Sequence, residues 1–250
     1  MYTLKAEHFG ADSFSRDSKK QDDQGLRNML SKWDEKNIDN APLREQFRHV
    51  YWVGGGSGAG KSTIARLIAA RYNLRVYTTD DVMSDHARRS TNEDSPMLHR
   101  FMAMDMNERW VNRTPKAMLE TFHWFHGEGF RSIVEDLLTL PRKPGVIVEG
   151  FRLLPRLVEP LLGVPARAVW LLPTPEFRRS VIERRGGSAT GFLARTSDPE
   201  KALRNLLERD RMFTDIVRTE TAQLELPMID VDGGMTEDDL AGQVTAVFGL

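Results

Sequence analysis

The pattern of apolar and polar positions changes at about residue 46. Residues 1–45 are mostly polar and rich in Asp, Lys, Ser and Gln, and only Leu26–Ile38 has apolar residues at helical spacing. From Val50 onward, short apolar runs alternate with helical segments. We therefore expect a polar N-terminal extension over 1–45 and one domain over 46–250. The extension either carries a helix that packs on the domain or serves as a regulatory or dimerisation arm.

Short apolar runs, most of them rich in β-branched or aromatic residues, predict buried strands. They are Val50–Val53, Leu74–Thr79, Val146–Glu149, Ala168–Leu172 and Met228–Val231. The predicted helices are Lys61–Arg71, Val82–Arg89, Pro96–Trp110, Pro115–Thr139, Pro175–Arg185, Pro199–Leu224 and Glu237–Phe248. Strand–helix alternation with continuously apolar strands favours an α/β fold with a mostly parallel sheet covered on both faces.

Composition narrows the classes further. The chain has 250 residues, 40% of them hydrophobic, which suffices for one sizeable core. Its formal net charge of -1 gives no global basic field, so we expect no nucleic-acid partner. It has no cysteine, and no apolar run approaches the roughly 20 residues that span a bilayer. We expect a soluble, cytoplasmic protein that does not bind membranes.

The first predicted strand is followed by a glycine-rich loop that matches G-x-x-x-x-G-K-[ST] at every position. Bare backbone lets successive N–H groups approach a polyphosphate, and the following helix directs its unpaired N–H groups at the same oxygens. We expect Lys61 to reach the β- and γ-phosphates and Ser62 to bind Mg²⁺. The expected nucleotide-binding residues are Gly55, Gly56, Ser57, Gly58, Ala59, Gly60, Lys61, Ser62 and Thr63.

Carboxylates follow two other predicted strands. Because ligands bind at the carboxyl ends of parallel strands, Asp80 and Asp81 are candidates for contact with a substrate hydroxyl. We expect Asp80 to be the base, although either aspartate is also a good helix N-cap. Glu149 ends a buried strand as the acid of a Walker B motif does, and it is a candidate for the magnesium site; a plain strand-end acid is the alternative.

Three segments, GGGSGAGKST, TTDDV and VIVEGFRLLP, together resemble the small-molecule kinases of the P-loop superfamily. These include nucleotide, shikimate and gluconate kinases and chloramphenicol phosphotransferase; VIVEG-x-x-x-L-P is similar to 2-phosphoglycerate kinase-like proteins. The resemblance runs from about Val50 to the C-terminus. It implies a three-layer, nucleoside monophosphate kinase-like fold with a five-stranded parallel sheet, ATP with Mg²⁺, and transfer to a small acceptor. Several relatives carry arginine near Met83, so acceptor identity does not transfer.

The resemblance also implies a mobile, arginine-rich lid over about 184–211. Arginine grips phosphate oxygens with two parallel hydrogen bonds, and glycines in this stretch let a lid move. Most of its arginines suit a solvated helix face, and we expect Arg185 and Arg209 to contact phosphate. The loop after the last strand, 232–234, is expected near the adenine base by the same resemblance.

We expect the acceptor to bind near a helical insert over about 84–142. The candidates to hold an anionic acceptor are Arg88, Arg89, Arg109, Arg113 and Arg152. Arg152 is the strongest of them, because it follows the Glu149 strand end directly. The insert is rich in methionine and aromatic residues, which more often form core than a specificity pocket. His123 and His126 are predicted to share a helix face, but no nearby Asp or Cys completes a metal site.

The sequence therefore favours an ATP- and Mg²⁺-dependent kinase of a small hydroxylated metabolite, nucleoside, nucleotide or antibiotic. One alternative is a nucleotide-binding regulatory ATPase that has no acceptor, with the N-terminal extension as its output. The other is a nucleic-acid-end kinase or RNA-binding ATPase, which the near-neutral charge disfavours. A homodimer is compatible with the sequence.

Overall fold

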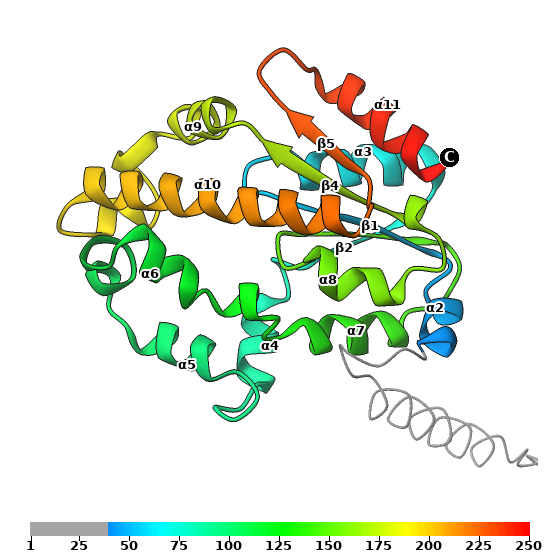
Figure 1. The fold of residues 1–250 in the computed structure, drawn as a ribbon, viewed down its shortest axis with the longest axis horizontal. Coiled ribbons are helices and arrows are strands. Elements are labelled where there is room, and N and C mark those ends of the chain that lie inside the picture. Colours follow the sequence, from blue (N-terminus) through cyan, green and yellow to red (C-terminus); the bar gives the residue numbers. More distant parts are fainter. Residues whose placement is uncertain (1–39) are drawn as a thin grey trace, which may run out of the picture.

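The computed structural model describes residues 40–250 (Figure 1). Its strands are β1 (Val50–Gly55), β2 (Arg75–Thr78), β3 (Val146–Glu149), β4 (Ala168–Pro173) and β5 (Met228–Val231). All neighbouring strands are parallel, in the order β2-β3-β1-β4-β5. Each predicted strand is confirmed within two residues at either end. The α/β fold with a five-stranded parallel sheet is confirmed as well.

The α-helices are distributed along the whole described chain. They are α2 (Ala41–Gln46), α3 (Lys61–Tyr72), α4 (Met83–Arg89), α5 (Pro96–Ala103), α6 (Pro115–Glu120), α7 (Phe130–Thr139), α8 (Pro155–Val158), α9 (Pro175–Arg184), α10 (Pro199–Gln223) and α11 (Glu237–Phe248). The short turns are η1 (Glu108–Asn112), η2 (His123–His126), η3 (Glu159–Leu161), η4 (Pro165–Arg167), η5 (Gly187–Ala189) and η6 (Leu193–Arg195). In the part of the chain that the structure describes, no helix is long and apolar enough to cross a membrane.

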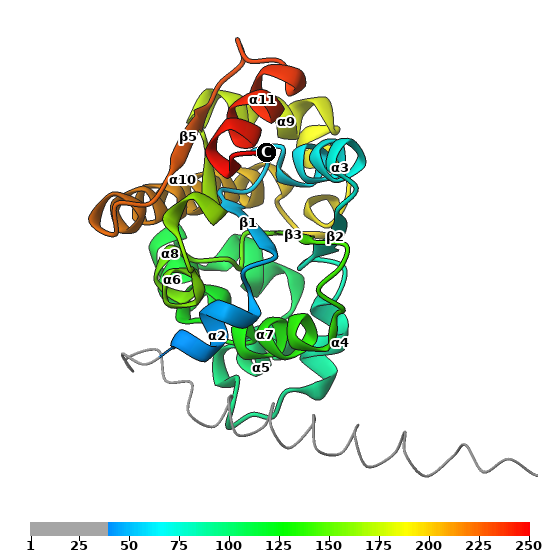
Figure 2. The same ribbon diagram turned by 90° about the vertical axis from the view of Figure 1, so that its right-hand side faces the viewer.

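Two hydrophobic clusters cover the two faces of the sheet. Helices α3 and α11 pack on one face, and α2, α7, α8 and α10 pack on the other (Figure 2). The three central strands are buried at every residue, as expected for parallel strands covered on both faces, whereas β5 at the edge alternates exposed and buried positions. The described domain therefore has three layers.

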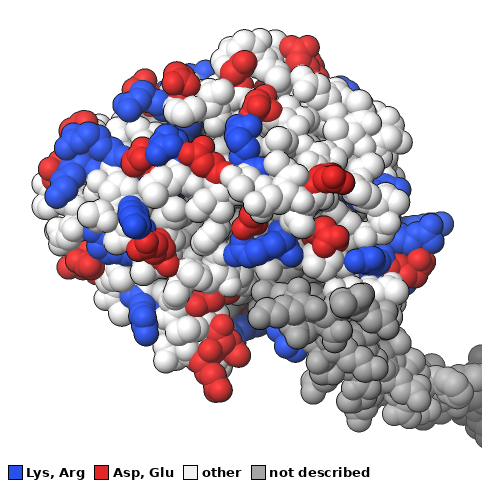
Figure 3. All heavy atoms as spheres, viewed as in Figure 1, with Lys and Arg blue, Asp and Glu red and all other residues white. Residues whose placement is uncertain are grey.

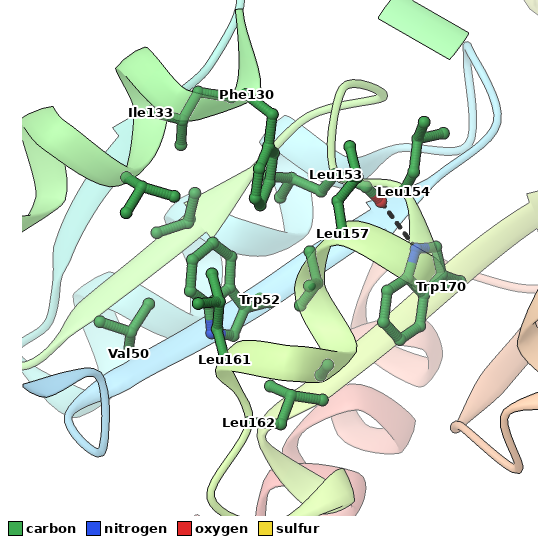
Figure 4. Packing of buried hydrophobic residues seen from close by; sticks show 14 of the residues in the cluster. Val50, Trp52, Phe130, Ile133, Leu153, Leu154, Leu157, Leu161, Leu162 and Trp170 are labelled. Carbon is green, nitrogen blue, oxygen red and sulfur yellow. Dashed lines mark hydrogen bonds between the residues drawn. The ribbon is translucent and has the colours of Figure 1, made fainter. Parts of the chain in front are cut away.

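The larger cluster fixes the position of the loop after β3. Trp52 and Trp170 are fully buried in it, and the indole Nε1 of Trp170 donates a 2.8 Å hydrogen bond to the carbonyl oxygen of Leu153 (Figure 4). A Cβ at Gly54 would lie 2.4 Å from that Nε1, so only glycine fits at this point of β1. The bond links β4 to the loop after β3, and the indole lies against β1 directly before the glycine-rich loop.

Two long helices predicted in the insert are interrupted. The helix predicted over Pro96–Trp110 ends at Ala103, and the Asp105 carboxylate then accepts a hydrogen bond from the Glu108 N–H, 2.8 Å away, at the start of η1. The helix predicted over Pro115–Thr139 ends first at Glu120, and after η2 the chain turns again where Gly127 and Gly129 take φ of 80° and 78°. Glycine adopts these angles without strain, so a Gly-Glu-Gly sequence separates η2 from α7.

The predicted helix over Leu26–Ile38 lies outside the described residues. Near the start of the described residues, Leu43 of α2 and Phe47 of the following turn belong to the larger core cluster. The Phe47 ring packs edge-on against Trp52, with ring centroids 5.8 Å apart. α2 is therefore packed into the domain. The roles predicted for 1–45 stay predictions.

Candidate active site

The glycine-rich loop joins β1 to α3 and has the backbone that the motif requires. Gly55, Gly58 and Gly60 all have positive φ, of 116°, 78° and 82°. A Cβ at Gly55 would lie 2.1 Å from the backbone oxygen of Leu171 on β4, so the chain passes this strand too closely for any other residue. The Gly56 N–H donates to the same oxygen at 2.9 Å. We call residues 55–63 the P-loop.

Lys61 begins α3 and folds back over the loop. Its side chain is 7% exposed, and Nζ donates a 2.7 Å hydrogen bond to the carbonyl oxygen of Gly56. Burial lowers the pKa of Lys61, while the carboxylates of Glu149 and Asp80 act to raise it. An ammonium group with one backbone acceptor is thus held inside a ring of backbone amides.

Ser62 and Glu149 meet although they are far apart in sequence. The strand order places β3 next to β1, with Val53 opposite Glu149, and the Ser62 hydroxyl donates to Glu149 Oε1 at 2.9 Å. Glu149 is 1% exposed, and burial raises its pKa against the opposing effects of Ser62 and Lys61. This hydroxyl–carboxylate pair has the oxygen ligands that Mg²⁺ prefers. Within residues 40–250 no cluster of three or more His, Cys, Asp or Glu side chains forms a metal site.

Asp80 lies in the turn after β2, next to β3 in the sheet. The Thr79 N–H bonds the Glu149 carbonyl at 2.9 Å, which fixes the start of this turn. The Asp80 side chain is solvent-accessible, yet the surrounding protein raises its pKa by desolvation, opposed mainly by Lys61 and then Arg152. The capping alternative is wrong: Val82 is the N-cap of α4, and no side chain caps this helix. Asp81 is exposed in the same turn.

Arg152 lies inside the protein rather than on the wall of a cleft. It is 3% exposed and donates to the Thr79 oxygen at 3.3 Å, the Gly129 oxygen at 2.9 Å and His86 Nδ1 at 3.0 Å. Burial lowers its pKa to about 10. These bonds hold the turn that precedes Asp80. Its Nε is buried without a partner, and the other guanidinium nitrogens bond the protein itself. The predicted role of Arg152 in acceptor binding stays a prediction.

Three charged side chains from α9 and α10 meet beside the P-loop. Asp210 binds both Arg178, with Nη2–Oδ2 at 2.7 Å, and Arg209, with Nη2–Oδ1 at 2.5 Å. A Cβ at Gly58 would lie 2.9 Å from Arg178 Nη1, so this guanidinium covers the loop. Arg209 also lies over the Phe122 ring, 4.8 Å from its centroid.

Of the two lid arginines predicted to contact phosphate, the structure brings only Arg209 to this cluster. Arg185 is exposed at the C-terminal end of α9, and its role stays a prediction. Arg178 and Asp210 were missed as site residues. A signal was available for Arg178, because it follows β4 at the carboxyl edge of the sheet by less than two helical turns. Asp210 carries no such signal, since it lies in the middle of a long helix.

A cavity of about 270 Å³ opens between the P-loop, the insert and α10. Ser57 and Met83 contribute to its wall together with Arg178, Arg209 and several aromatic rings. His123 lies behind the rings of Phe101 and Trp124, at centroid distances of 5.2 Å and 4.1 Å. Its two ring nitrogens are buried without partners, and burial lowers its pKa to about 3. His126 is exposed and bonds the Glu120 carbonyl instead.

Comparisons with known proteins find distant similarity to solved structures only. No family model matches the sequence, and no curated protein matches it. A solved structure of deoxyadenosine kinase from M. mycoides with bound dATP shares 12% identity and a TM-score of 0.41, covering 80% of this chain and 100% of that one. An uncharacterized protein from Eubacterium ventriosum ATCC 27560 shares 14% identity and a TM-score of 0.39, covering 80% and 97%.

The structure itself shows a five-stranded parallel sheet in the order β2-β3-β1-β4-β5, with the glycine-rich loop between β1 and α3. A fold alone does not assign a reaction or a substrate, so the function is argued from the residues of the site.

Proposed function

We propose that this chain is an ATP- and Mg²⁺-dependent phosphotransferase that acts on a small hydroxylated acceptor. The observation that carries the proposal is the convergence of three strand ends on one loop. Lys61 Nζ lies within the P-loop, and Ser62 bonds Glu149 at 2.9 Å beside it. Asp80 is close enough to both to share their electrostatic field.

The residues present fit a nucleoside triphosphate with magnesium. Glycines at positive φ leave backbone amides open where a triphosphate would bind, and Lys61 and Arg178 supply positive charge at the same place. Ser62 and Glu149 would hold Mg²⁺. When bound, this ion would neutralise charge on the β- and γ-phosphates.

The acceptor hydroxyl oxygen forms a bond to the γ-phosphorus, and the bond from that phosphorus to the β,γ-bridging oxygen breaks. ADP leaves with the electron pair, and the hydroxyl proton passes to the Asp80 carboxylate and then to solvent. Desolvation makes Asp80 a stronger base than a free aspartate, because it raises the pKa of this carboxyl. Arg178 and Arg209 would stabilise charge on the transferring group.

Binding is tested by isothermal titration of MgATP into the wild type and Lys61→Ala. We expect the variant to lose at least tenfold in affinity, since it removes a charged phosphate ligand, whereas Lys201→Ala on the exposed start of α10 should bind as the wild type does. Equal affinity of wild type and Lys61→Ala contradicts nucleotide binding at this loop.

Transfer is tested with Asp80→Asn. We expect acceptor-stimulated ADP release to fall about 10²- to 10⁴-fold while MgATP affinity changes little, because general-base catalysis contributes that much. The control is Glu93→Gln, which changes an exposed carboxylate between α4 and α5 and should stay within a few-fold of wild type. ADP release that no acceptor stimulates, with MgATP binding intact, would favour the regulatory ATPase instead.

A further inference from the structure

The cavity beside the P-loop has an unusual lining. Thirteen residues line it, and seven of these are aromatic, although the whole chain of 250 residues has only 12 Phe, 5 Trp and 4 Tyr. They come from the insert, from the turn after β3, from the lid region and from α10. The aromatic residues are Phe101, Trp110, Phe122, Trp124, Phe151, Phe192 and Phe213. A third of the aromatic side chains thus surround one space.

The cavity reaches the place where a phosphoryl group would be transferred. Ser57 of the P-loop lines one side of it. Met83 lines another side, and its N–H bonds the Asp80 carbonyl at 3.3 Å, so the turn that carries Asp80 borders the same space. A molecule in the cavity would therefore lie next to both the P-loop and the turn that carries the candidate base.

The rings in the lining contact one another and form one aromatic surface. Phe122 and Phe151 are nearly parallel, with an interplanar angle of 10° and centroids 6.0 Å apart. Trp124 meets Phe151 edge-on at 4.8 Å, and Trp110 meets Phe192 at 4.8 Å. Aromatic walls favour offset stacking and edge contacts with another ring. The volume of about 270 Å³ is near the lower end of ligand pockets, which suits one ring system with a small polar substituent.

Charge in the lining argues against an anionic acceptor. Its charged residues are Arg178, Arg209 and Asp210, and Asp210 pairs with both arginines, which leaves one positive charge in excess. Arg178 covers the P-loop, where the phosphates of ATP would need it. His123 behind the rings stays neutral at physiological pH, since burial lowers its pKa to about 3. A second phosphate or carboxylate in this space would be desolvated without its own partner.

We propose that the phosphate acceptor is an uncharged aromatic alcohol whose ring lies among these side chains and whose hydroxyl points toward Ser57 and Asp80. This inference rests on the proposed kinase function. It differs from the sequence-based expectation for Arg152, because here the aromatic lining rather than that buried guanidinium binds the acceptor. Nucleosides and aromatic antibiotics share this chemistry; 2-phosphoglycerate, shikimate and gluconate do not.

The inference is tested by ADP release from the full chain with MgATP and one acceptor at a time. The aromatic arm contains adenosine, thymidine and chloramphenicol, and the anionic arm contains 2-phosphoglycerate, shikimate and gluconate. We expect at least one aromatic alcohol to stimulate release above the rate with MgATP alone, and the responding compound separates nucleoside from antibiotic. Stimulation by the anionic arm only, or by neither arm while MgATP still binds, overturns the aromatic acceptor. Failure of MgATP to bind overturns the kinase proposal itself.

A variant places the acceptor in this cavity. Phe192 is 40% exposed and its ring packs on Trp110, so Phe192→Ala should fold normally while removing one wall. We expect KM for the aromatic acceptor to rise roughly 2- to 10-fold, the effect of losing one ring contact, with KM for MgATP unchanged. Met102→Ala is the matched control, because Met102 is 43% exposed and does not line the cavity. An unchanged acceptor KM in Phe192→Ala would contradict the assignment.

Discussion

Two side chains, His123 and Arg152, bury polar nitrogen atoms that have no hydrogen-bond partner. His123 is 1% exposed with both nitrogens unpaired, and Arg152 is 3% exposed with Nε unpaired. Burying a polar atom without a partner costs roughly 1–3 kcal/mol. Arg152 recovers much of this cost through its bonds to Thr79, Gly129 and His86. His123 has no such bonds, so its contribution to stability is expected to depend on pH.

The pH dependence has a definite sign. The unfolded chain binds a proton at His123 below its ordinary pKa of 6.5, whereas the folded chain does so only near 3. Stability is therefore full above pH 6.5 and falls as the pH drops from 6.5 toward 3. Between pH 8 and pH 5 this one group lowers the free energy of unfolding by about 2 kcal/mol.

His123→Phe removes that contribution and fills the same aromatic space. We expect the variant to lose about 2 kcal/mol less than wild type between pH 8 and pH 5, measured by urea unfolding at both values. His126→Phe, which changes an exposed imidazole on the same turn, should keep the wild-type dependence. Identical pH profiles for wild type and His123→Phe would show that the buried imidazole does not govern acid sensitivity.

The P-loop and the insert differ in how far local sequence determines them. The strand, the P-loop and α3 were predicted correctly, because the apolar run and the glycine spacing act within a few residues. The Ser62–Glu149 bond needed the sheet order, which no local pattern supplies. The breaks after Ala103 and Glu120 and at Gly127 were missed, because helical periodicity continues across them. Asp210 was missed because its partners lie on another helix and within the same helix.

Glycine at position 55 is expected to be indispensable for stability. Gly55→Ala would place Cβ 2.1 Å from the Leu171 oxygen at a φ of 116°, so β1 and β4 would have to separate. We expect a loss of about 2–4 kcal/mol in the free energy of unfolding, from strain and overpacking together.

The matched control is Gly242→Ala within α11. Gly242 is exposed, its Cβ would meet nothing within 4 Å, and the helix continues on both sides. Alanine there should raise stability by roughly 0.5–1 kcal/mol, because glycine loses more backbone entropy in a helix. Thermal and urea unfolding of both variants give the comparison, and a neutral Gly55→Ala would contradict the close packing described for β1.

At the scale of the whole molecule, the charges on the face seen in Figure 3 bear on possible partners. In the view of Figure 3, Lys and Arg side chains lie next to Asp and Glu side chains over α9 and α10, and no area of one sign dominates this face. On α10, Arg211 bonds Glu208 at 2.7 Å and Asp215 at 2.7 Å. With a formal net charge of -1, this surface lacks the basic track that a phosphate backbone requires.

We therefore expect no binding to labelled single- or double-stranded oligonucleotides by fluorescence anisotropy at physiological salt. Any weak signal at low salt should vanish on addition of salt, because scattered exposed charges are screened. Tight binding that persists at physiological salt would instead support the nucleic-acid-end kinase alternative.

The position of β1 between β3 and β4 has a consequence for synthesis on the ribosome. Its hydrogen-bonding partners lie about 95 and 115 residues further along the chain, so β1 emerges long before either edge can be paired. The nascent protein therefore carries an unsatisfied apolar strand until Ala168 and its neighbours have left the exit tunnel. We expect chaperones that bind unfolded chains to bind this nascent chain. We also expect fragments ending before β3 to aggregate instead of folding.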